Sequence, residues 1–189
     1  KLRSVLGLTA HVVYPASDWY FGTQGDANGL VTMINPYPVK GIDTFLEIAR
    51  RMPQLQFLLV ESWKLSSDAL AALQSRLREL PNVRLQHRVS DMREIYGQTR
   101  LLLVPSMWEE GFGMVAVEAQ SCGIPVIASE RGGLPESVGD GGMLIRDFRN
   151  VKAWIHAIGA VLDDDNAYRT WSARALAHAR SADFDRQEL

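Results

Sequence analysis

The chain has 189 residues, of which 47% are hydrophobic, and this fits one domain with a full hydrophobic core. Its formal net charge of −2 lacks the basic excess of nucleic-acid-binding proteins, and no apolar run approaches the roughly 20 residues that span a bilayer. We therefore expect a soluble domain, and the single cysteine, which cannot form an internal disulfide, fits a cytoplasmic location.

Residues 1–29 differ from the rest of the chain. They contain aromatic residues and glycines but show no sustained hydrophobic period, as in the segment HVVYPASDWYFGTQGDANG. We interpret them as a linker to another lobe or as an arm that lies on the first strand. Residues 30–189 then form the folded domain.

From residue 30 onward, apolar strand patterns alternate with helical patterns. The predicted strands cover Leu30–Asn35, Leu55–Glu61, Val83–His87, Leu101–Val104, Pro125–Ala128 and Met143–Ile145. The predicted helices cover Ile42–Met52, Ser66–Leu80, Met92–Tyr96, Met114–Cys122, Leu134–Val138, Val151–Leu162 and Asp165–Ser181. This alternation predicts an α/β fold, a Rossmann-like doubly wound parallel sheet of about six strands with helices on both faces.

The turn between the fourth strand and the helix at Met114 has the features of an anion site. It lies at the carboxyl end of a parallel strand, where ligands bind in such sheets. Gly111 and Gly113 permit a sharp bend and close approach of a ligand to the backbone, and the N–H groups of the helix's first turn face outward as donors. These features predict that a phosphate binds here.

Two carboxylates flank the predicted phosphate position. Glu110 lies in the turn, and Glu118 lies four residues beyond Met114, about 6 Å along the helix at ~1.5 Å per residue. A carboxylate can accept from two vicinal hydroxyls, so Glu118 suits a ribose diol and Glu110 suits hydroxyls beyond the phosphates. The ligand would then be a sugar nucleotide. Alternatively, Glu110 is a partner of the helix dipole and Glu118 an exposed helical glutamate.

The segment from Pro105 to Glu136, PSMWEEGFGMVAVEAQSCGIPVIASERGGLPE, resembles the E(x7)E region of the family 4 (group 1) glycosyltransferases. The family's PS, EGFG, EA, GxPV and GGxxE elements are all present in order. The similarity continues upstream through VRLQHRVSDMREIYGQTRLLLVPS and through Lys40-Gly41, which matches the family's KG pair. It covers roughly residues 30 to 146.

The resemblance implies that the chain is the carboxyl-terminal, donor-binding lobe of a two-lobed GT-B glycosyltransferase. It further implies a nucleotide-diphosphate sugar donor, retention of anomeric configuration, and neither a cofactor nor an obligatory metal. The acceptor would be held by an amino-terminal lobe, through which any membrane contact would also occur. A single lobe is then expected to be inactive alone.

The resemblance also assigns roles to particular residues. Lys40 would neutralise the diphosphate and stabilise the charge that grows on it as the sugar departs. Together with Glu110 it forms the expected catalytic pair. The expected substrate-binding residues are Asn35, Lys40, Arg88, Val89, Glu110, Gly111, Phe112, Gly113, Met114, Glu118 and Arg131, with Arg88 and Val89 holding the base through main-chain groups.

The chain departs from the family pattern at three positions. Family members commonly have an arginine that binds phosphate where this chain has Asn35, and glycines where it has Glu61 and His87. Another cation, Arg88, Arg131 or Lys64, could replace the missing charge. Arg131 is the best placed of these, because it precedes a pair of glycines at the carboxyl end of a strand.

Other candidate motifs are better interpreted as structural. The histidines, His11, His87, His156 and His178, have no partner at metal-ligand spacing, so we predict no metal site. Asp163–Asp165 forms a solvated turn and the N-cap of the last helix, and Cys122 is a small buried residue.

Two alternative functions use the same lobe. One is a GT-B sugar-nucleotide epimerase or phosphorylase, which fits the EGFG motif less well. The other is a non-catalytic module that only binds sugar nucleotides.

Overall fold

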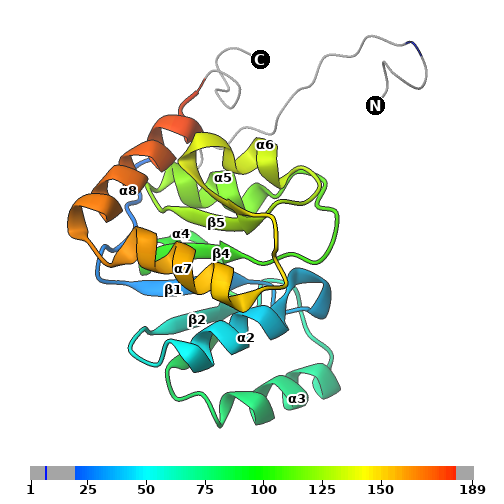
Figure 1. Ribbon diagram of the computed structural model, residues 1–189. Helices are drawn as coiled ribbons and strands as arrows, with labels where there is room; N and C mark the ends of the chain where they lie inside the picture. The colour runs from blue at the N-terminus through cyan, green and yellow to red at the C-terminus, as the bar shows by residue number, and fades with distance from the viewer. Residues whose placement is uncertain (1–6, 8–19, 182–189) are drawn as a thin grey trace.

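The computed structural model describes residue 7 and residues 20–181 (Figure 1). Most of the predicted linker or arm at 1–29, including His11, lies outside the described residues. The strands are β1 (Leu30–Ile34), β2 (Phe57–Val60), β3 (Val83–Gln86), β4 (Thr99–Val104), β5 (Val126–Ser129) and β6 (Gly142–Ile145). The helices are α2 (Ile42–Arg51), α3 (Ser67–Leu77), α4 (Arg93–Tyr96), α5 (Met114–Ser121), α6 (Leu134–Val138), α7 (Val151–Leu162) and α8 (Asp165–Ala179), with 3₁₀ turns η2 (Pro38–Lys40) and η3 (Gly139–Gly141).

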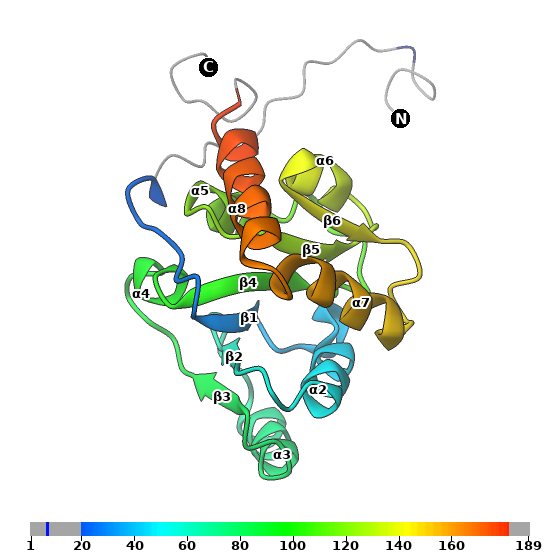
Figure 2. The ribbon, with the colours of Figure 1, turned by 60° about the vertical axis from the view of Figure 1, so that its left-hand side comes forward.

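The strands form one six-stranded sheet in the order β3-β2-β1-β4-β5-β6, with every neighbouring pair parallel. Figure 2 shows this order from β6 at the top to β3 at the bottom. The chain winds outward from β1 in one direction and then, starting at β4, in the other. This confirms the predicted Rossmann-like doubly wound sheet.

Alternation along the strands builds a core on each face of the sheet. In β4, Leu101 and Leu103 pack with α2, α3 and α7, while Leu102 and Val104 pack with α4, α5 and α6. All four leucine and valine side chains are buried, as expected for a parallel sheet covered on both faces. Helix α8 packs against α7 and α5.

Residues 20–29 pack along the edge of this domain. The ring of Tyr20 meets that of Tyr96 edge-on, with 5.2 Å between centroids. The amide of Gly25 donates to the Cys122 carbonyl at 3.0 Å, and that of Asp26 donates to the Thr99 carbonyl at 3.1 Å. This part of the amino-terminal segment is therefore bonded to the start of β4 and the end of α5.

All predicted strands and helices are present, and their ends differ by a few residues. Strand β4 begins at Thr99 rather than Leu101, because the Thr99 hydroxyl is satisfied inside the core by Thr32 Oγ1 and the Ile95 carbonyl, both at 2.8 Å. The last helix ends at Ala179 rather than Ser181. Hydrophobic periodicity did not reveal the two 3₁₀ turns, since each is too short to show a period.

Two of the structural interpretations are confirmed. Asp164 is the N-cap of α8, and its carboxylate accepts from the Asn166 amide at 3.0 Å. Cys122 is buried, and burial raises the pKa of its thiol to about 11, so it is not a reactive nucleophile. None of the helices in the described part of the chain is both long and apolar enough to cross a membrane.

Candidate functional site

The candidate site lies where the winding of the sheet reverses. Strands β1 and β4 are neighbours, but the chain leaves them toward opposite sides, and this opens a crevice at their carboxyl ends. A pocket of about 240 Å³ occupies this position. Besides apolar residues of β1 and β4, it is lined by Asn35, Lys40, Trp63, Glu110, Gly113 and Met114.

The turn after β1 brings Lys40 to the pocket. Gly41 follows η2 with a φ of 85°, and a Cβ added there would lie 1.8 Å from the Pro105 carbonyl oxygen. Only a glycine allows the two turns to approach so closely. The Met107 amide then donates to the Val39 carbonyl at 2.9 Å, which joins the turn after β1 to the turn after β4.

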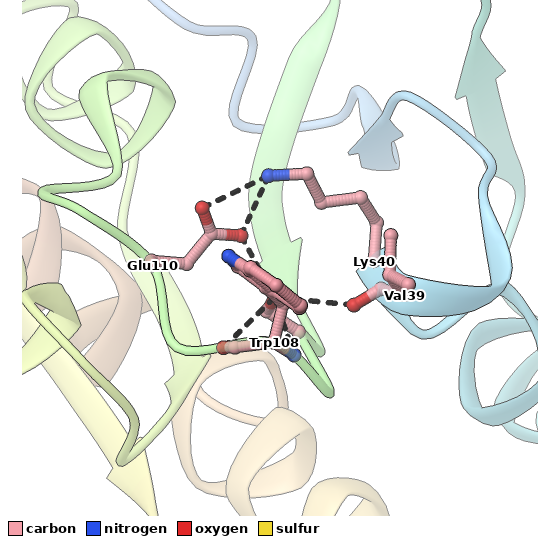
Figure 3. A network of polar contacts seen from close by, with 5 residues as sticks. Val39, Lys40, Trp108 and Glu110 are labelled. Atoms are coloured by element: carbon pink, nitrogen blue, oxygen red, sulfur yellow. Dashed lines mark hydrogen bonds and ion pairs between the residues drawn. The ribbon is translucent and has the colours of Figure 1, made fainter.

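Lys40 and Glu110 meet across the crevice (Figure 3). The Lys40 ammonium donates to Oε1 and Oε2 of Glu110 at 2.7 and 2.9 Å. Their side chains are only 19% and 11% exposed, so the pair is shielded from much of the solvent screening that weakens surface ion pairs. The Trp63 ring lies beside the ammonium, with 5.1 Å from Nζ to its centroid.

Ser106 also positions Glu110. Its side chain is buried, and its hydroxyl donates to Glu110 Oε1 at 2.7 Å. The Trp108 amide donates to Ser106 Oγ at 3.3 Å, and the Val39 carbonyl lies 3.3 Å from the same oxygen. Glu110 is thus oriented by two donors from two different strand ends.

The first turn of α5 supplies the predicted anion donors. Gly113 precedes the helix with a φ of 92°, and a Cβ there would collide with the Leu134 side chain at 2.6 Å. Gly113, Met114 and Val115 line the pocket. Because the first N–H groups of a helix have no intrahelical partners, this end of α5 can donate to a phosphate in the pocket.

The loop after β5 packs directly on the Glu110 turn. Gly132 has a φ of 56°, and a Cβ there would lie 2.2 Å from the Glu110 carbonyl oxygen. The Gly133 amide donates to that same carbonyl at 2.8 Å. The paired glycines therefore serve close packing of two turns, in addition to any approach to ligand.

Arg131 is held by neighbouring side chains at this loop. It forms an ion pair with Glu109, and its guanidinium lies over the Phe148 ring at 5.0 Å. Glu109 also accepts from the Gly132 amide at 2.9 Å. Arg131 does not line the pocket, and its predicted role as the replacement cation stays a prediction.

Glu118 lies one turn further along α5 and binds Tyr96, which sequence reasoning missed. The Tyr96 hydroxyl donates to Glu118 Oε2 at 2.6 Å. Burial raises the pKa of Glu118, and the hydrogen bond from Tyr96 partly offsets this rise. Burial, and then the charge of Glu118, raise the pKa of Tyr96 well above its usual range.

The remaining predicted residues lie around the pocket or apart from it. Asn35 lines the pocket, has a φ of 62°, and accepts from the Trp63 amide at 2.7 Å. Arg88 is exposed and has no ion pair among the described residues, and Val89 packs on the core beside α4. Gly111 is exposed, while Phe112 packs against Val117 and Ala179.

Glu61 and His87, which stand where the family commonly has glycines, are hydrogen-bonded to each other. His87 Nδ1 lies 2.6 Å from Glu61 Oε2, and the Leu65 amide donates to Glu61 Oε1 at 2.7 Å. The hydrogen bond from His87 is the main reason why the pKa of Glu61 is lowered. This pair joins the carboxyl ends of β2 and β3.

Three residues at or near the site were not singled out from the sequence. Ser106 had a signal, because it belongs to the PS element of the resemblance. Trp63 had a weaker one, an aromatic residue after a buried strand. Tyr96 had none, since its role depends on the approach of α4 to α5. In the described part of the chain, no cluster of three or more His, Cys, Asp or Glu could hold a metal ion.

Comparisons with known proteins place this geometry in a family. A family model described as "Glycosyl transferases group 1" matches residues 21–178. The D-inositol 3-phosphate glycosyltransferase of Mycobacterium sp. (strain KMS) is 35% identical over 152 residues, which cover 75% of this chain and 33% of that protein. The enzyme of the same name from Mycolicibacterium smegmatis is 32% identical over 157 residues. The chain thus spans about a third of the length of the curated relatives it matches.

Two solved structures share the fold of this chain. Anabaena HepE in complex with UDP-glucose is 27% identical, with a TM-score of 0.72 over 84% of this chain and 46% of that one. WaaG, a glycosyltransferase involved in lipopolysaccharide biosynthesis, has a TM-score of 0.74 over 96% of this chain and 56% of that one. At 18% identity, the likeness to WaaG shows the fold alone.

Proposed function

Because the chain belongs to the group 1 glycosyl transferases, we propose that it is the carboxyl-terminal, donor-binding domain of a retaining GT-B enzyme. This enzyme transfers a sugar from a nucleotide-diphosphate sugar to an acceptor held by a second lobe. The observation that carries the proposal is the pocket between β1 and β4, where Lys40 and the first turn of α5 face the same space. A cation and free helix donors are what a diphosphate requires.

Each part of the donor has a proposed partner. Lys40 and the α5 amides hold the diphosphate and stabilise its charge as the sugar leaves. Glu110, in the same pocket, accepts from hydroxyls of the transferred sugar, and Glu118, further along α5, accepts from the ribose diol. With these groups taking the phosphate charge, we propose that transfer needs no metal.

The solved relative supports the choice of donor to test first. Anabaena HepE was solved with UDP and with UDP-glucose, and it is 26–27% identical to this chain. A uridine diphosphate sugar is therefore the first candidate, followed by the guanosine and adenosine forms. The base would be held by main-chain groups near Arg88 and Val89, after β3.

The test is product analysis with the complete protein that carries this domain. It is supplied with UDP-, GDP- or ADP-glucose and a panel of polyol and sugar acceptors, with and without EDTA. We expect a glycoside with the donor's anomeric configuration, seen by NMR, and activity that survives EDTA. Isomerised donor would indicate an epimerase, and tight binding without any product would indicate a non-catalytic module. Either result would overturn the proposal.

A further inference from the structure

The cation that the proposed function assigns to phosphate is already occupied. The Lys40 ammonium donates hydrogen bonds to both carboxylate oxygens of Glu110, at 2.7 and 2.9 Å. An ammonium has three donors in all, so one is left over, and a phosphate that takes more than this one must displace the charged carboxylate from Lys40. While it accepts these hydrogen bonds, Glu110 has few lone pairs left for a hydroxyl of the sugar.

Glu110 has a second anchor that does not involve Lys40. The Ser106 hydroxyl donates to Oε1 at 2.7 Å, which is shorter than its 3.3 Å distance to the Val39 carbonyl. Ser106 is buried at the end of β4, and the Trp108 amide fixes its oxygen at 3.3 Å. This anchor does not depend on Lys40. Figure 3 shows Lys40 approaching from the side opposite to the Glu110 backbone.

We propose that Lys40 and Glu110 exchange partners when the donor binds, and that Ser106 is the positioning residue that keeps Glu110 aimed at the sugar throughout. The inference rests on the proposed function. The diphosphate takes the Lys40 ammonium, and Glu110 keeps the Ser106 hydroxyl on Oε1. Oε2 is then free for a sugar hydroxyl. The bare diphosphate breaks the ion pair without supplying this new donor, so the intact sugar nucleotide recovers an interaction that the bare diphosphate lacks.

The exchange is tested by calorimetry with the bare nucleoside diphosphates UDP, GDP and ADP. Glu110→Gln keeps the shape of the side chain but removes the charge that competes for Lys40. It should strengthen binding of the bare diphosphate by about threefold to tenfold. In a Lys40→Ala background the same change should give a clearly smaller gain, because only the direct repulsion between Glu110 and the phosphates is then relieved. Weaker binding by Glu110→Gln, or an equal gain in both backgrounds, would overturn the exchange.

The role of Ser106 is tested by comparing the sugar nucleotide with its bare diphosphate. Ser106→Ala should reduce the affinity for the sugar nucleotide by about tenfold, as expected for a lost hydrogen bond to a charged group. It should leave the affinity for the bare diphosphate within about twofold. Ser106→Thr, which keeps the hydroxyl, should restore the preference for the sugar form.

Ser129→Ala is the matched control. Ser129 is also fully buried at a strand end, and its hydroxyl has no hydrogen-bond partner among the described residues. This control should change neither affinity. An equal loss for both ligands in Ser106→Ala, with thermal unfolding unchanged, would show that Ser106 only supports the fold. If no diphosphate binds the wild-type chain, the proposed function fails, whereas binding without the Glu110→Gln gain overturns the exchange alone.

Discussion

At the scale of single residues, Lys40 supplies the positive charge of the pocket, as the one cationic side chain among the described residues that line it. A charge-assisted hydrogen bond to phosphate contributes roughly 1.5 to 3 kcal/mol. Lys40→Ala should therefore weaken the binding of a nucleoside diphosphate by about 10- to 100-fold in calorimetry. Lys152→Ala, at the exposed start of α7, removes the same charge far from the pocket and should bind as the wild type does. Unchanged affinity in a folded Lys40→Ala variant would remove Lys40 from the site.

The proposed contact of Glu118 with the ribose diol predicts that diphosphate binding depends on pH. Its carboxylate must be ionised to accept from both ribose hydroxyls, and burial raises its pKa. The affinity should therefore fall as the pH drops from neutrality. Tyr96→Phe removes the hydrogen bond that holds this pKa down, so the fall should begin at a higher pH than in the wild type.

Two features of this experiment make it specific to Glu118. Protonation of the phosphate itself contributes equally to the wild-type and variant profiles and cancels in the comparison. Tyr168→Phe removes a buried hydroxyl on α8, away from Glu118, and should leave the profile unmoved. Coincident profiles for Tyr96→Phe and the wild type would mean that Tyr96 does not tune Glu118.

The same raised pKa affects stability in the opposite direction. The folded protein binds the Glu118 proton more readily than the unfolded chain, so this group favours folding most below the ordinary value of 4.5. That contribution is lost as the pH rises through the folded pKa. At neutral pH, Glu118→Gln should therefore raise the thermal midpoint of the unliganded chain while weakening its binding of diphosphate. A lowered midpoint at neutral pH, with the fold retained, would contradict this.

At the scale of elements, the site depends on the close contact of two turns. Gly41→Ala combines a left-handed φ with a clash against the Pro105 carbonyl, so relief requires the turns to separate. It should cost about 3 kcal/mol or more in urea unfolding and should also weaken diphosphate binding. Gly22→Ala has a φ of 97° but nothing within 4 Å, so it isolates the cost of the φ alone, about 1 kcal/mol. Equal losses in the two variants would show that the turns need not touch.

The strands and helices were predictable because the spacing of apolar residues in the sequence follows which side chains are buried. Strand β2 and the Leu101–Val104 part of β4 are buried on both faces, and each appears in the sequence as an unbroken apolar stretch. The site was predictable in part, since glycines mark the turns where the backbone must bend. The partners of the charged groups were not predictable. Tyr96 reaches Glu118 across 22 positions, and Lys40 reaches Glu110 across 70. Only the packing of α4, α5 and η2 determines such pairs.

At the scale of the whole molecule, the chain spans about a third of its curated relatives. As the proposed donor-binding lobe, it would supply no acceptor pocket and would leave the reacting carbon of the donor open to water. Purified residues 1–189 should therefore bind a nucleoside diphosphate without transferring sugar to any acceptor. Radiolabelled donor provides the measurement, and the complete protein is the positive control. Efficient transfer by the 189-residue chain would show that every catalytic group lies within it.

The proposed function requires that a nucleotide-diphosphate sugar binds in the crevice between β1 and β4. An NMR titration of the ¹⁵N-labelled chain with UDP-glucose, GDP-glucose and ADP-glucose tests this most directly, because it maps the contact on every amide. With the donor that binds, the largest shifts should fall on Gly41, Gly113, Met114 and Val115, while α8 stays unmoved. Shifts that cluster elsewhere, or no saturable shift with any of the three donors, would contradict binding in this crevice.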